Sequence, residues 1–383
     1  MRIMFWNEAF LPNIGGVEIF TKRLAEGLIQ RGHEIAVIAG AHTDGLPDSE
    51  QTEGAQVHRF RFLEAINGSR QKGHAALENL MELLQTVADI KRRFRPDVVH
   101  VNLAGANSYF HLRTLKAHPT STVVTFQAAL NDRFKTSDGL LAQVISQAAR
   151  VVAVSCAAAE NISTFTGYPR CKIDIVTPGI PPDHFIQCQA SDASGIPIIV
   201  FLGRLAKEKG ADIAVEAVER LNGAARLRII GDGPQRKNLE DMVHSRSLAQ
   251  FVSFEGRVDD ETRKRLLAES SIMVVPSRHE ELFGMVAVEG ALSGLPVVAS
   301  AVGGLSEIVV GRGLLCPPGD AKALAKSLEV LIKDRLFAAR LGQAARAHAL
   351  ANHTVDRMID AYERLYTECA LPTGNSRVSR SVG

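Results

Sequence analysis

Short apolar runs rich in Val and Ile alternate along the chain with segments whose apolar residues recur at helical spacing. This alternation constrains the fold most, because strand, helix and strand in that order form a βαβ unit. Near-continuous Val/Ile runs are typical of parallel strands covered by helices on both faces, so we expect an α/β fold. The strands expected in the first half are Arg2–Trp6, Glu34–Ile38, Val98–Val101, Val123–Phe126, Val151–Val154 and Ile173–Val176, with helices over Val17–Gln30 and Leu77–Phe94.

A second set of alternating strands follows a stretch rich in Pro, Ser, Gly, Asp and Gln between Pro181 and Pro197. That composition is typical of a linker, and 383 residues exceed what one compact core usually holds. We expect two facing Rossmann-like domains, residues 1–185 and 196–354. A helix over 355–370 is expected to pack back on the first domain, before a disordered tail over 371–383. The strands expected in the second domain are Ile198–Phe201, Leu227–Ile230, Val252–Phe254, Ile272–Val275 and Val297–Ala299.

Charge and cysteine content disfavour several classes of protein. Lys and Arg number 44 against 42 Asp and Glu, so the net charge of +2 gives no reason to expect nucleic acid as a partner. No apolar run approaches the roughly 20 residues of a membrane span, and we see no signal peptide at the N-terminus. The five cysteines are scattered without a C-x-x-C pair, which disfavours a disulfide framework or a zinc site. We therefore expect a cytoplasmic protein.

A basic loop follows the first strand of the second half. Gly203, Arg204 and Lys209 lie between this strand and an amphipathic segment. In an open parallel sheet, ligands bind beyond the carboxyl ends of the strands. Arg204 can form two parallel hydrogen bonds to phosphate oxygens, and Lys209 adds a positive charge. A solvated basic loop is the alternative interpretation of these two cations.

A tight turn, Gly231-Asp232-Gly233-Pro234, follows the next strand. Gly231 and Gly233 would let a ligand approach the backbone there. Taken alone, the turn is typical of an ordinary βα connection, and it lacks the third glycine of a dinucleotide fingerprint. A Rossmann dehydrogenase is disfavoured because no G-x-G-x-x-G follows the first strand of the chain.

The segment after strand Ile272–Val275 carries the strongest local signal. A polar loop containing Glu281 leads into a helix that begins near Gly284, whose first amide groups are free to face an anion. Glu289 lies in that otherwise apolar helix and needs a partner if it is buried. Glu281 and Glu289 would each bind a different hydroxylated part of an extended ligand. A structural cap or an internal salt bridge is the alternative.

The first half carries weaker candidates. Gly15 and Gly16 precede the first expected helix, where a phosphate or sugar can reach the backbone and the helix N-terminus. A flexible loop is the alternative. His100 and Asn102 lie at the end of a strand, where a donor or acceptor sugar is expected, although a lone His near a strand end is as often structural.

These segments in this order resemble the retaining GT-B glycosyltransferases, specifically glycosyltransferase family 4. The match covers most of the chain and is most specific from Val200 to Asp320. The resemblance implies that a sugar passes from a UDP- or GDP-sugar, with retention, to a glycan, lipid-linked or small-molecule acceptor. Such a reaction would serve cell-surface polysaccharide or glycoconjugate biosynthesis.

The resemblance also implies roles for individual residues. Arg204 and Lys209 would bind the diphosphate, Glu281 the donor-sugar hydroxyls and Glu289 the ribose. Backbone amides near Phe283 would meet the sugar and phosphate. The implied catalytic residues are Arg204, Lys209 and Glu281; the donor site comprises Gly15, Gly16, Gly203, Gly231, Gly233, Leu282, Phe283, Gly284 and Glu289; sugar or acceptor contacts are Glu18, His100, Asn102 and Gln127.

The chain departs from the family at one of these positions. Many members carry His after the strand Val123–Phe126, where this chain has Gln127. Gln donates and accepts hydrogen bonds but does not titrate, so a role that needs a charged imidazole is lost. The departure bears on the donor-sugar contacts more than on the fold.

We expect neither a metal nor a cofactor. Breaking the anomeric bond leaves negative charge on the nucleotide diphosphate, so catalysis needs fixed positive groups there. Arg204, Lys209 and helix N-termini supply them. The Asp-x-Asp motif of metal-dependent glycosyltransferases does not occur in this sequence.

Other functions remain open. A nucleotide-sugar 2-epimerase or another GT-B enzyme would use the same fold, and a non-catalytic sugar-binding protein is suggested by Gln127. Contact with the inner face of the membrane is a separate hypothesis, based on cations beside aromatic residues in segments 59–62 and 91–95. A solvated helix end is the alternative for these segments. The sequence identifies neither the donor sugar, the acceptor nor the oligomeric state.

Overall fold

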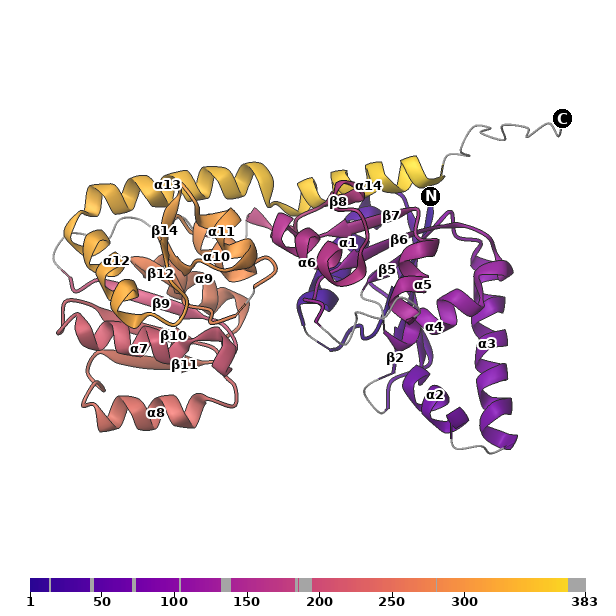
Figure 1. Cartoon of the computed structure of the whole chain (residues 1–383), viewed down its shortest axis with the longest axis horizontal. Coiled ribbons are helices and arrows are strands. Elements are labelled where there is room, and N and C mark those ends of the chain that lie inside the picture. Colours follow the sequence, from indigo (N-terminus) through magenta and orange to yellow (C-terminus); the bar gives the residue numbers. More distant parts are fainter. Residues whose placement is uncertain are drawn as a thin grey trace. The chain divides into compact units, whose positions relative to one another are not determined.

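The computed structural model describes residues 1–13, 15–41, 45–70, 74–102, 105–131, 139–182, 185, 195–279 and 281–370 (Figure 1). The chain forms two compact units. The first comprises Met1–Ala153, Ile162–Val176 and Met358–Gly383, and the second comprises Val154–Asn161 and Thr177–Arg357. Most of the expected linker, at 183–184 and 186–194, and the expected tail at 371–383 lie outside the described residues.

The first unit is built on a sheet with the strand order β3-β4-β2-β1-β5-β6-β7-β8. All neighbouring strands are parallel except β3, which pairs antiparallel with β4 at the sheet edge. The chain leaves β1 toward β2 on one side and later adds β5 on the other, so the strand order reverses between β1 and β5. The strands are β1 Arg2–Asn7, β2 Glu34–Gly40, β3 Ser49–Thr52, β4 Ala55–Phe60, β5 Val98–Asn102, β6 Ser121–Phe126, β7 Arg150–Ala153 and β8 Ile173–Ile175.

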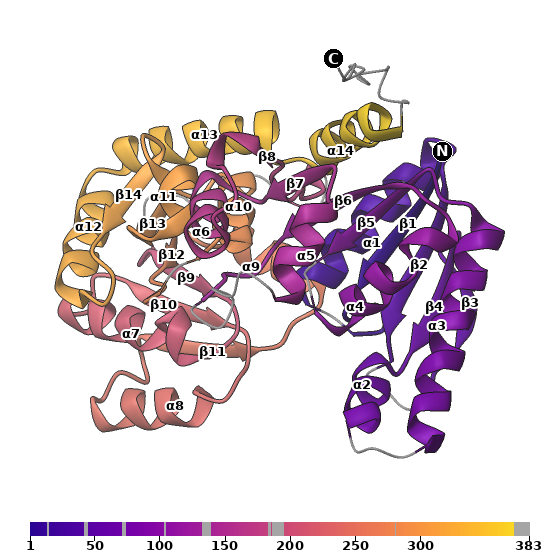
Figure 2. The same ribbon diagram turned by 45° about the vertical axis from the view of Figure 1, so that its right-hand side comes forward.

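Helices cover this sheet, and α2 and α3 lie side by side (Figures 1 and 2). The central strands are interior throughout: every residue of β5 is buried, as the Val-rich sequence of a parallel strand predicts. The α-helices are α1 Gly16–Gln30, α2 Phe62–Arg70, α3 His74–Phe94, α4 Ala106–Arg113, α5 Leu140–Gln147 and α6 Cys156–Thr166, which runs from the second unit into the first.

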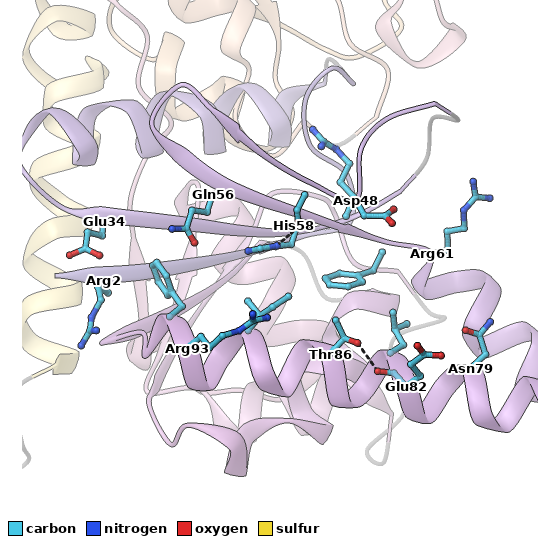
Figure 3. A pocket seen from close by; sticks show the side chains of 16 residues that line it. Arg2, Glu34, Asp48, Gln56, His58, Arg61, Asn79, Glu82, Thr86 and Arg93 are labelled. Carbon is cyan, nitrogen blue, oxygen red and sulfur yellow. Dashed lines mark hydrogen bonds between the residues drawn. The ribbon is translucent and has the colours of Figure 1, made fainter.

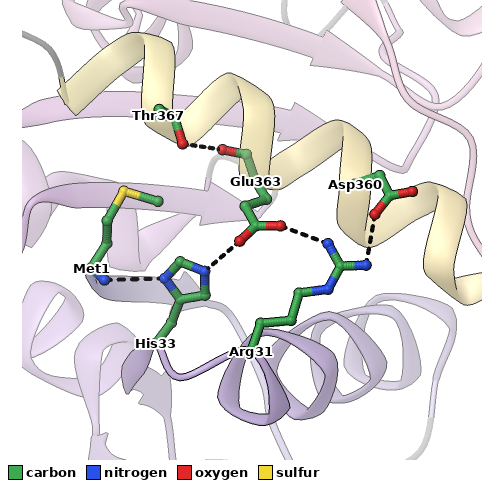
Figure 4. Close-up of polar contacts among 6 residues, drawn as sticks. All are labelled: Met1, Arg31, His33, Asp360, Glu363 and Thr367. Carbon is green, nitrogen blue, oxygen red and sulfur yellow. Dashed lines mark hydrogen bonds and ion pairs between the residues drawn. The ribbon is translucent and has the colours of Figure 1, made fainter.

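The last helix, α14 (Val355–Ala370), belongs to the first unit from Met358 onward. Its fully buried Tyr362 and Tyr366 contact the sheet. At the surface, Arg31 donates to Asp360 and Glu363 at 2.6 Å each (Figure 4). His33, at the start of β2, pairs with the other oxygen of Glu363 at 2.8 Å. The turn before β2 thus holds α14 in place, and His33 has a structural role.

The second unit contains a wholly parallel sheet with the order β11-β10-β9-β12-β13-β14. Its strand order reverses between β9 and β12. The strands are β9 Ile198–Leu202, β10 Arg226–Ile230, β11 Val252–Gly256, β12 Ile272–Val275, β13 Val297–Ser300 and β14 Gly313–Cys316; the helices are α7 Ala211–Arg220, α8 Arg236–Ser245, α9 Asp260–Ala268, α10 Met285–Leu292, α11 Gly303–Val309, α12 Ala321–Lys333 and α13 Arg335–Asn352.

Apolar faces of α7 and α12 close the core of this unit. Ile213, Leu324 and Leu328 pack with the β9 residues Ile199 and Phe201 in one buried cluster. Such burial contributes about 25 cal/mol for each Å² of apolar surface removed from water. The expected α/β fold with two parallel-sheet units is confirmed, and the loops after β9, β10 and β12 leave the sheet at one edge.

Some boundaries differ from expectation. Residues 154–161 belong to the second unit, although the sequence suggested a first domain of 1–185. Within that unit, Ser155 Oγ donates to the carbonyl of Leu282, 127 residues away. Strands β3, β4 and β14 were not expected. In the part of the chain that the structure describes, no helix combines the length and apolarity needed to span a bilayer.

Candidate active site

Loops after β9, β10 and β12 meet at the carboxyl edge of the second sheet. Gly231 has φ +136°, and a Cβ atom there would lie 2.0 Å from the carbonyl oxygen of Gly203. Gly210 has φ +71°, and a Cβ atom there would lie 2.0 Å from the carbonyl oxygen of Pro276. Any other residue would force these backbones apart, so glycine is needed for the loops to assemble.

Gly233 joins the loops after β9 and β10. Its φ is +159°, and a Cβ atom there would lie 2.6 Å from the carbonyl oxygen of Leu205. The amide of Leu205 donates to Asp232 at 2.9 Å, and the Leu205 carbonyl accepts from Gln235 at 2.9 Å. In the structure, the glycine-rich turn therefore has a packing role. Ligand binding at this turn would also require open space beside it.

Lys209 and Glu281 form an ion pair at this edge. Lys209 Nζ lies 2.6 Å from Glu281 Oε2, and the side chains are 34% and 22% exposed. The Arg278 amide donates to the Glu208 carbonyl at 2.8 Å and so holds the two loops in register. The sequence placed Lys209 and Glu281 on different loops, and the fold brings them together.

Arg204 lies on the same turn as Lys209 but pairs within it. Its guanidinium donates to Glu208 at 2.5 Å, and its side chain is 64% exposed. An exposed pair four residues apart contributes little to stability, roughly 0.5 kcal/mol or less, so Arg204 can exchange Glu208 for an anionic ligand at small cost. The structure does not join Arg204 to Glu281 through any contact it describes.

The loop after β12 ends at Gly284, which caps α10 with φ +98°. A Cβ atom there would lie 2.4 Å from Leu305 Cδ2 on α11. Leu282 and Phe283 are 8% and 6% exposed, so their side chains anchor the loop in the core. The backbone of residues 281–284 is thereby fixed at the start of α10, where helix amide groups favour an anion.

Glu289 has the partner that its place in an apolar helix requires. Its Oε2 lies 3.6 Å from Nε of Arg263 on α9, and the two side chains are 13% and 22% exposed. Arg263 also pairs with Asp260 at 3.3 Å. Glu289 thus takes part in the internal salt bridge that we considered as the alternative to a ligand contact. A ribose would have to share the carboxylate with Arg263.

In the first unit, a polar network occupies the carboxyl ends of β1, β5 and β6. Asn102 donates to Asn7 at 3.1 Å and to Thr21 at 3.1 Å. Asn7 donates to Thr21 at 2.8 Å, and Gln127 donates to Oδ1 of Asn102 at 3.2 Å. Asn102 is fully buried, whereas Gln127 is only half-buried. One N–H of Gln127 is therefore directed to Asn102, and the hydrogen bond links Gln127 to this network.

Gly15, Gly16 and Glu18 surround the start of α1. A Cβ atom on Gly15 would meet the Glu18 carboxylate at 2.4 Å, whereas one on Gly16 would meet nothing within 4 Å. Gly16 therefore borders open space, and Glu18 folds back on the loop.

The prediction that His100 contacts a sugar is wrong. The side chain is fully buried, with Nδ1 2.6 Å from Tyr366 Oη and Nε2 2.7 Å from Thr125 Oγ1. Burial lowers the pKa of His100 to about 3, so the imidazole is neutral. Because β5 is covered on both faces, each of its side chains points into the interior, and His100 joins the sheet to α14.

The basic segments suggested for membrane contact are partly interior. Lys91 is 1% exposed and lies 4.9 Å from the Trp6 ring centroid, while Arg59 is 4% exposed and donates to Glu50 at 2.5 Å. Arg61 and Arg93 instead line a groove of about 810 Å³ between β4 and α3 (Figure 3). Two of the cations on which that hypothesis relied are thus unavailable to lipid headgroups.

Sequence reasoning missed several residues that build the site. Asn7 and Thr21 support Asn102, Arg278 donates to Asp212 beside the Lys209 turn, and Ser155 contacts the loop after β12. Asn7 ends a strand beside the point of strand reversal, which is a signal that position alone could have provided. The other contacts join residues distant in sequence and left no local pattern.

Comparison with known proteins identifies the family. The model for "Glycosyl transferases group 1" matches residues 189–348, and that for "Glycosyltransferase Family 4" matches residues 14–184. The glycogen synthase of Mycobacterium tuberculosis is 27% identical over 96% of this chain and 94% of its own. A GDP-mannose-dependent alpha-mannosyltransferase of Mycolicibacterium smegmatis is 29% identical over 95% of this chain and 97% of its own.

Solved structures share the fold. Sucrose-phosphate synthase from Thermosynechococcus elongatus superposes with a TM-score of 0.78 at 20% identity, covering 96% of this chain and 99% of that chain. Anabaena HepE, solved in complex with UDP, superposes with a TM-score of 0.77 at 20% identity, covering 96% and 100%. Two consecutive family matches and this architecture lead to one conclusion: the chain belongs to the GT-B glycosyltransferases of family 4.

Proposed function

We propose that this chain transfers a sugar, with retention of anomeric configuration and without a metal ion, from a UDP- or GDP-sugar to a glycan, lipid-linked or small-molecule acceptor. The observation that carries the proposal is the contact of 2.6 Å between Lys209 Nζ and Glu281 Oε2 at the point where the strand order reverses. A cation and a hydrogen-bond acceptor side by side suit a ligand that carries phosphate next to hydroxyl groups.

Lys209 would stabilise the leaving diphosphate. The negative charge on the diphosphate grows as the anomeric bond breaks, so a fixed cation stabilises the transition state more than the bound donor. Lys209 is two-thirds covered by its surroundings and held by Glu281, which limits the reorganisation needed during the reaction. Arg204, on the same turn, would add a second cation once a phosphate displaces Glu208.

Glu281 would bind donor-sugar hydroxyls. Its Oε2 accepts from Lys209, and Ser277 Oγ lies 3.4 Å from the same oxygen. Oε1 is then the oxygen available to a ligand hydroxyl. Glu289 would hold the ribose beside Arg263.

Each of the two proposed donor nucleotides is supported by a different similar protein. HepE is solved with UDP, and the mycobacterial mannosyltransferase is named for its use of GDP-mannose. UDP- and GDP-sugars are therefore both candidate donors for this chain.

The test is turnover of the purified chain with a panel of UDP-, GDP- and ADP-sugars, with and without pooled glycan, glycolipid and small alcohol acceptors. We expect nucleoside diphosphate release from one UDP- or GDP-sugar to depend on an acceptor. Release without acceptor, together with an isomerised sugar, would instead identify an epimerase. Tight binding without turnover would identify a sugar-binding protein. NMR of the product anomeric proton tests retention, and EDTA against added Mg²⁺ tests metal independence.

A further inference from the structure

Ser155 makes an unexpected contact with the loop that carries Glu281. The residue precedes α6 and is 2% exposed. Its Oγ donates to the Leu282 carbonyl at 2.5 Å and accepts from the Ala158 amide at 2.9 Å. One hydroxyl therefore caps a helix and holds a peptide of the candidate donor site at the same time.

A second side chain reinforces this contact. The carboxylate of Glu307, on α11, accepts from the amides of Cys156 at 2.9 Å and Ala157 at 2.7 Å. The first three amide groups of α6 are thus satisfied by Ser155 and Glu307. The start of α6 is fixed both to α11 and to the loop after β12, and neither contact depends on a ligand.

The loop backbone is also held at the preceding carbonyl. Gly304 of α11 donates from its amide to the Glu281 carbonyl at 2.7 Å. A Cβ atom on Gly304 would lie 2.3 Å from the Leu282 carbonyl oxygen, so α11 lies directly against this backbone. Two successive carbonyls, those of Glu281 and Leu282, are therefore engaged by α11 and by Ser155.

Because the peptide bond is planar, fixing these two carbonyls also fixes the direction of the following amide N–H groups. In a trans peptide the N–H group points opposite to the carbonyl. Because the Leu282 carbonyl faces Ser155, the amide of Phe283 faces away from it. The Leu282 amide likewise faces away from Gly304. Each N–H group thus points away from the residue that binds the carbonyl of the same peptide, in the segment that leads into α10.

We propose that Ser155 is a positioning residue for sugar transfer, which fixes the Leu282–Phe283 peptide so that the Phe283 amide donates a hydrogen bond to the donor substrate. The inference rests on the proposed function and assigns no direct ligand contact to Ser155. Glu307 supports it by holding the first turn of α6. Loss of the hydroxyl would let the peptide rotate and would weaken a hydrogen bond that matters most when charge develops on the leaving group.

Two substitutions separate positioning from folding. Ser155→Ala removes both the donor and the helix cap, whereas Ser155→Thr keeps the hydroxyl and should restore turnover. Asp334→Ala is the matched control, because Asp334 caps α13 through the Phe337 amide at 2.8 Å and is exposed. It loses a helix cap of the same kind without touching the loop after β12.

The experiment measures kcat, KM for the nucleotide sugar, and the Kd of the nucleoside diphosphate alone, all per folded molecule. We expect Ser155→Ala to lower kcat by about tenfold or more, with Kd for the nucleoside diphosphate changed less than about threefold, because the hydrogen bond at issue is strongest in the transition state. Asp334→Ala should leave kcat within about twofold of wild type.

Each result of these kinetic measurements supports or overturns the positioning role of Ser155. Wild-type kcat in Ser155→Ala overturns the inference, as does an equal loss in Ser155→Ala and Asp334→Ala. If Ser155→Ala does not fold, Ser155→Cys, which has similar size but donates weakly, takes its place and is judged by the same criterion. Failure of the wild-type chain to turn over any nucleotide sugar would instead refute the proposed function.

Discussion

His100 Nδ1 and the Tyr366 hydroxyl lie 2.6 Å apart in the interior of the first unit, although 266 residues separate them in sequence. The pair joins β5 to α14. Tyr366→Phe removes the hydroxyl and leaves a buried imidazole nitrogen without its partner. We expect the free energy of unfolding, measured in urea, to be about 1–3 kcal/mol lower than that of the wild type. Tyr109→Phe, at a partly accessible ring, is the control and should change stability by less than about 0.5 kcal/mol. Equal stability of Tyr366→Phe and wild type would show that the hydrogen bond adds nothing.

Lys91 should make stability depend on pH in the alkaline range. Burial lowers the pKa of Lys91 from 10.5 to about 7. Its polar neighbour is His111, whose pKa is lowered by burial and then by Lys91. Between about pH 7 and 10.5 the unfolded chain binds the proton that the folded chain releases, so stability rises with pH across this window. Below pH 7 the full cost of the buried charge is present.

Lys91→Met removes this titration. We expect Lys91→Met to gain more stability relative to wild type at pH 6.5 than at pH 9, by roughly 1–3 kcal/mol in denaturant unfolding. Lys322→Met, at an exposed helix position, should show the same difference at both pH values. A Lys91→Met effect that is constant with pH would mean that the amine keeps its ordinary pKa.

Glu363 should make the stability of the protein depend on pH in the acid range. The pKa of its carboxyl is lowered first by the hydrogen bond to His33 and then by that to Arg31 (Figure 4). Since the folded pKa is below the unfolded value, the contribution to stability is present above pH 4.5 and is lost as pH falls through the folded pKa. The pair is near the surface, so the effect is about 1 kcal/mol or less.

Glu363→Gln tests this contribution. We expect the variant to be less stable than wild type at pH 7 and to approach wild type at pH 3, as measured by thermal unfolding. Glu368 lies on the same helix as Glu363 and pairs with Arg150 at 2.7 Å. Glu368→Gln therefore controls for the loss of an exposed ion pair in which His33 takes no part. A difference between Glu363→Gln and wild type that grows toward low pH would show that folding does not lower the pKa of Glu363.

Gly210 and Gly167 offer a matched pair with φ of +71° and +70°. A Cβ atom on Gly210 would lie 2.0 Å from the Pro276 carbonyl oxygen, whereas one on Gly167 would meet nothing within 4 Å. Gly167→Ala should therefore cost about 1 kcal/mol for the left-handed backbone alone. Gly210→Ala should cost at least about 2 kcal/mol more and lower donor binding, because the Lys209 turn must shift. Equal losses of stability in the two variants would show that the loops can separate freely.

The sequence predicted those features of the fold that depend on residues close together along the chain. The loops at Gly203 and Gly231 follow apolar strands, and parallel strands bring their carboxyl ends to one edge. The separate roles of Lys209 and Glu281 came from the family resemblance, and their ion pair was not predicted, since no composition or period links residues 72 positions apart. His100 was misjudged because strand position does not reveal that a late helix covers that face. Strand β4 was overlooked because its buried face includes Arg59, whose charge is satisfied by Glu50.

Ser155 shows the same limit. The Ser155 hydroxyl caps α6 through the Ala158 amide, a role that Ser often has at the start of a helix. The second partner of the hydroxyl, the Leu282 carbonyl, depends on how α6 packs against the second unit's own loop. No pattern within reach of Ser155 in the sequence encodes that contact.

Substitution of Lys209 tests the central claim most directly. Lys207 lies on the same turn, is exposed, and carries the same charge, so Lys207→Met controls for the change in net charge. With the nucleotide sugar that the wild type uses, we expect Lys209→Met to lower kcat by about a hundredfold or more while the protein stays folded, and Lys207→Met to remain within about twofold. Turnover of Lys209→Met at the wild-type rate would contradict the assignment of this cation to the departing diphosphate.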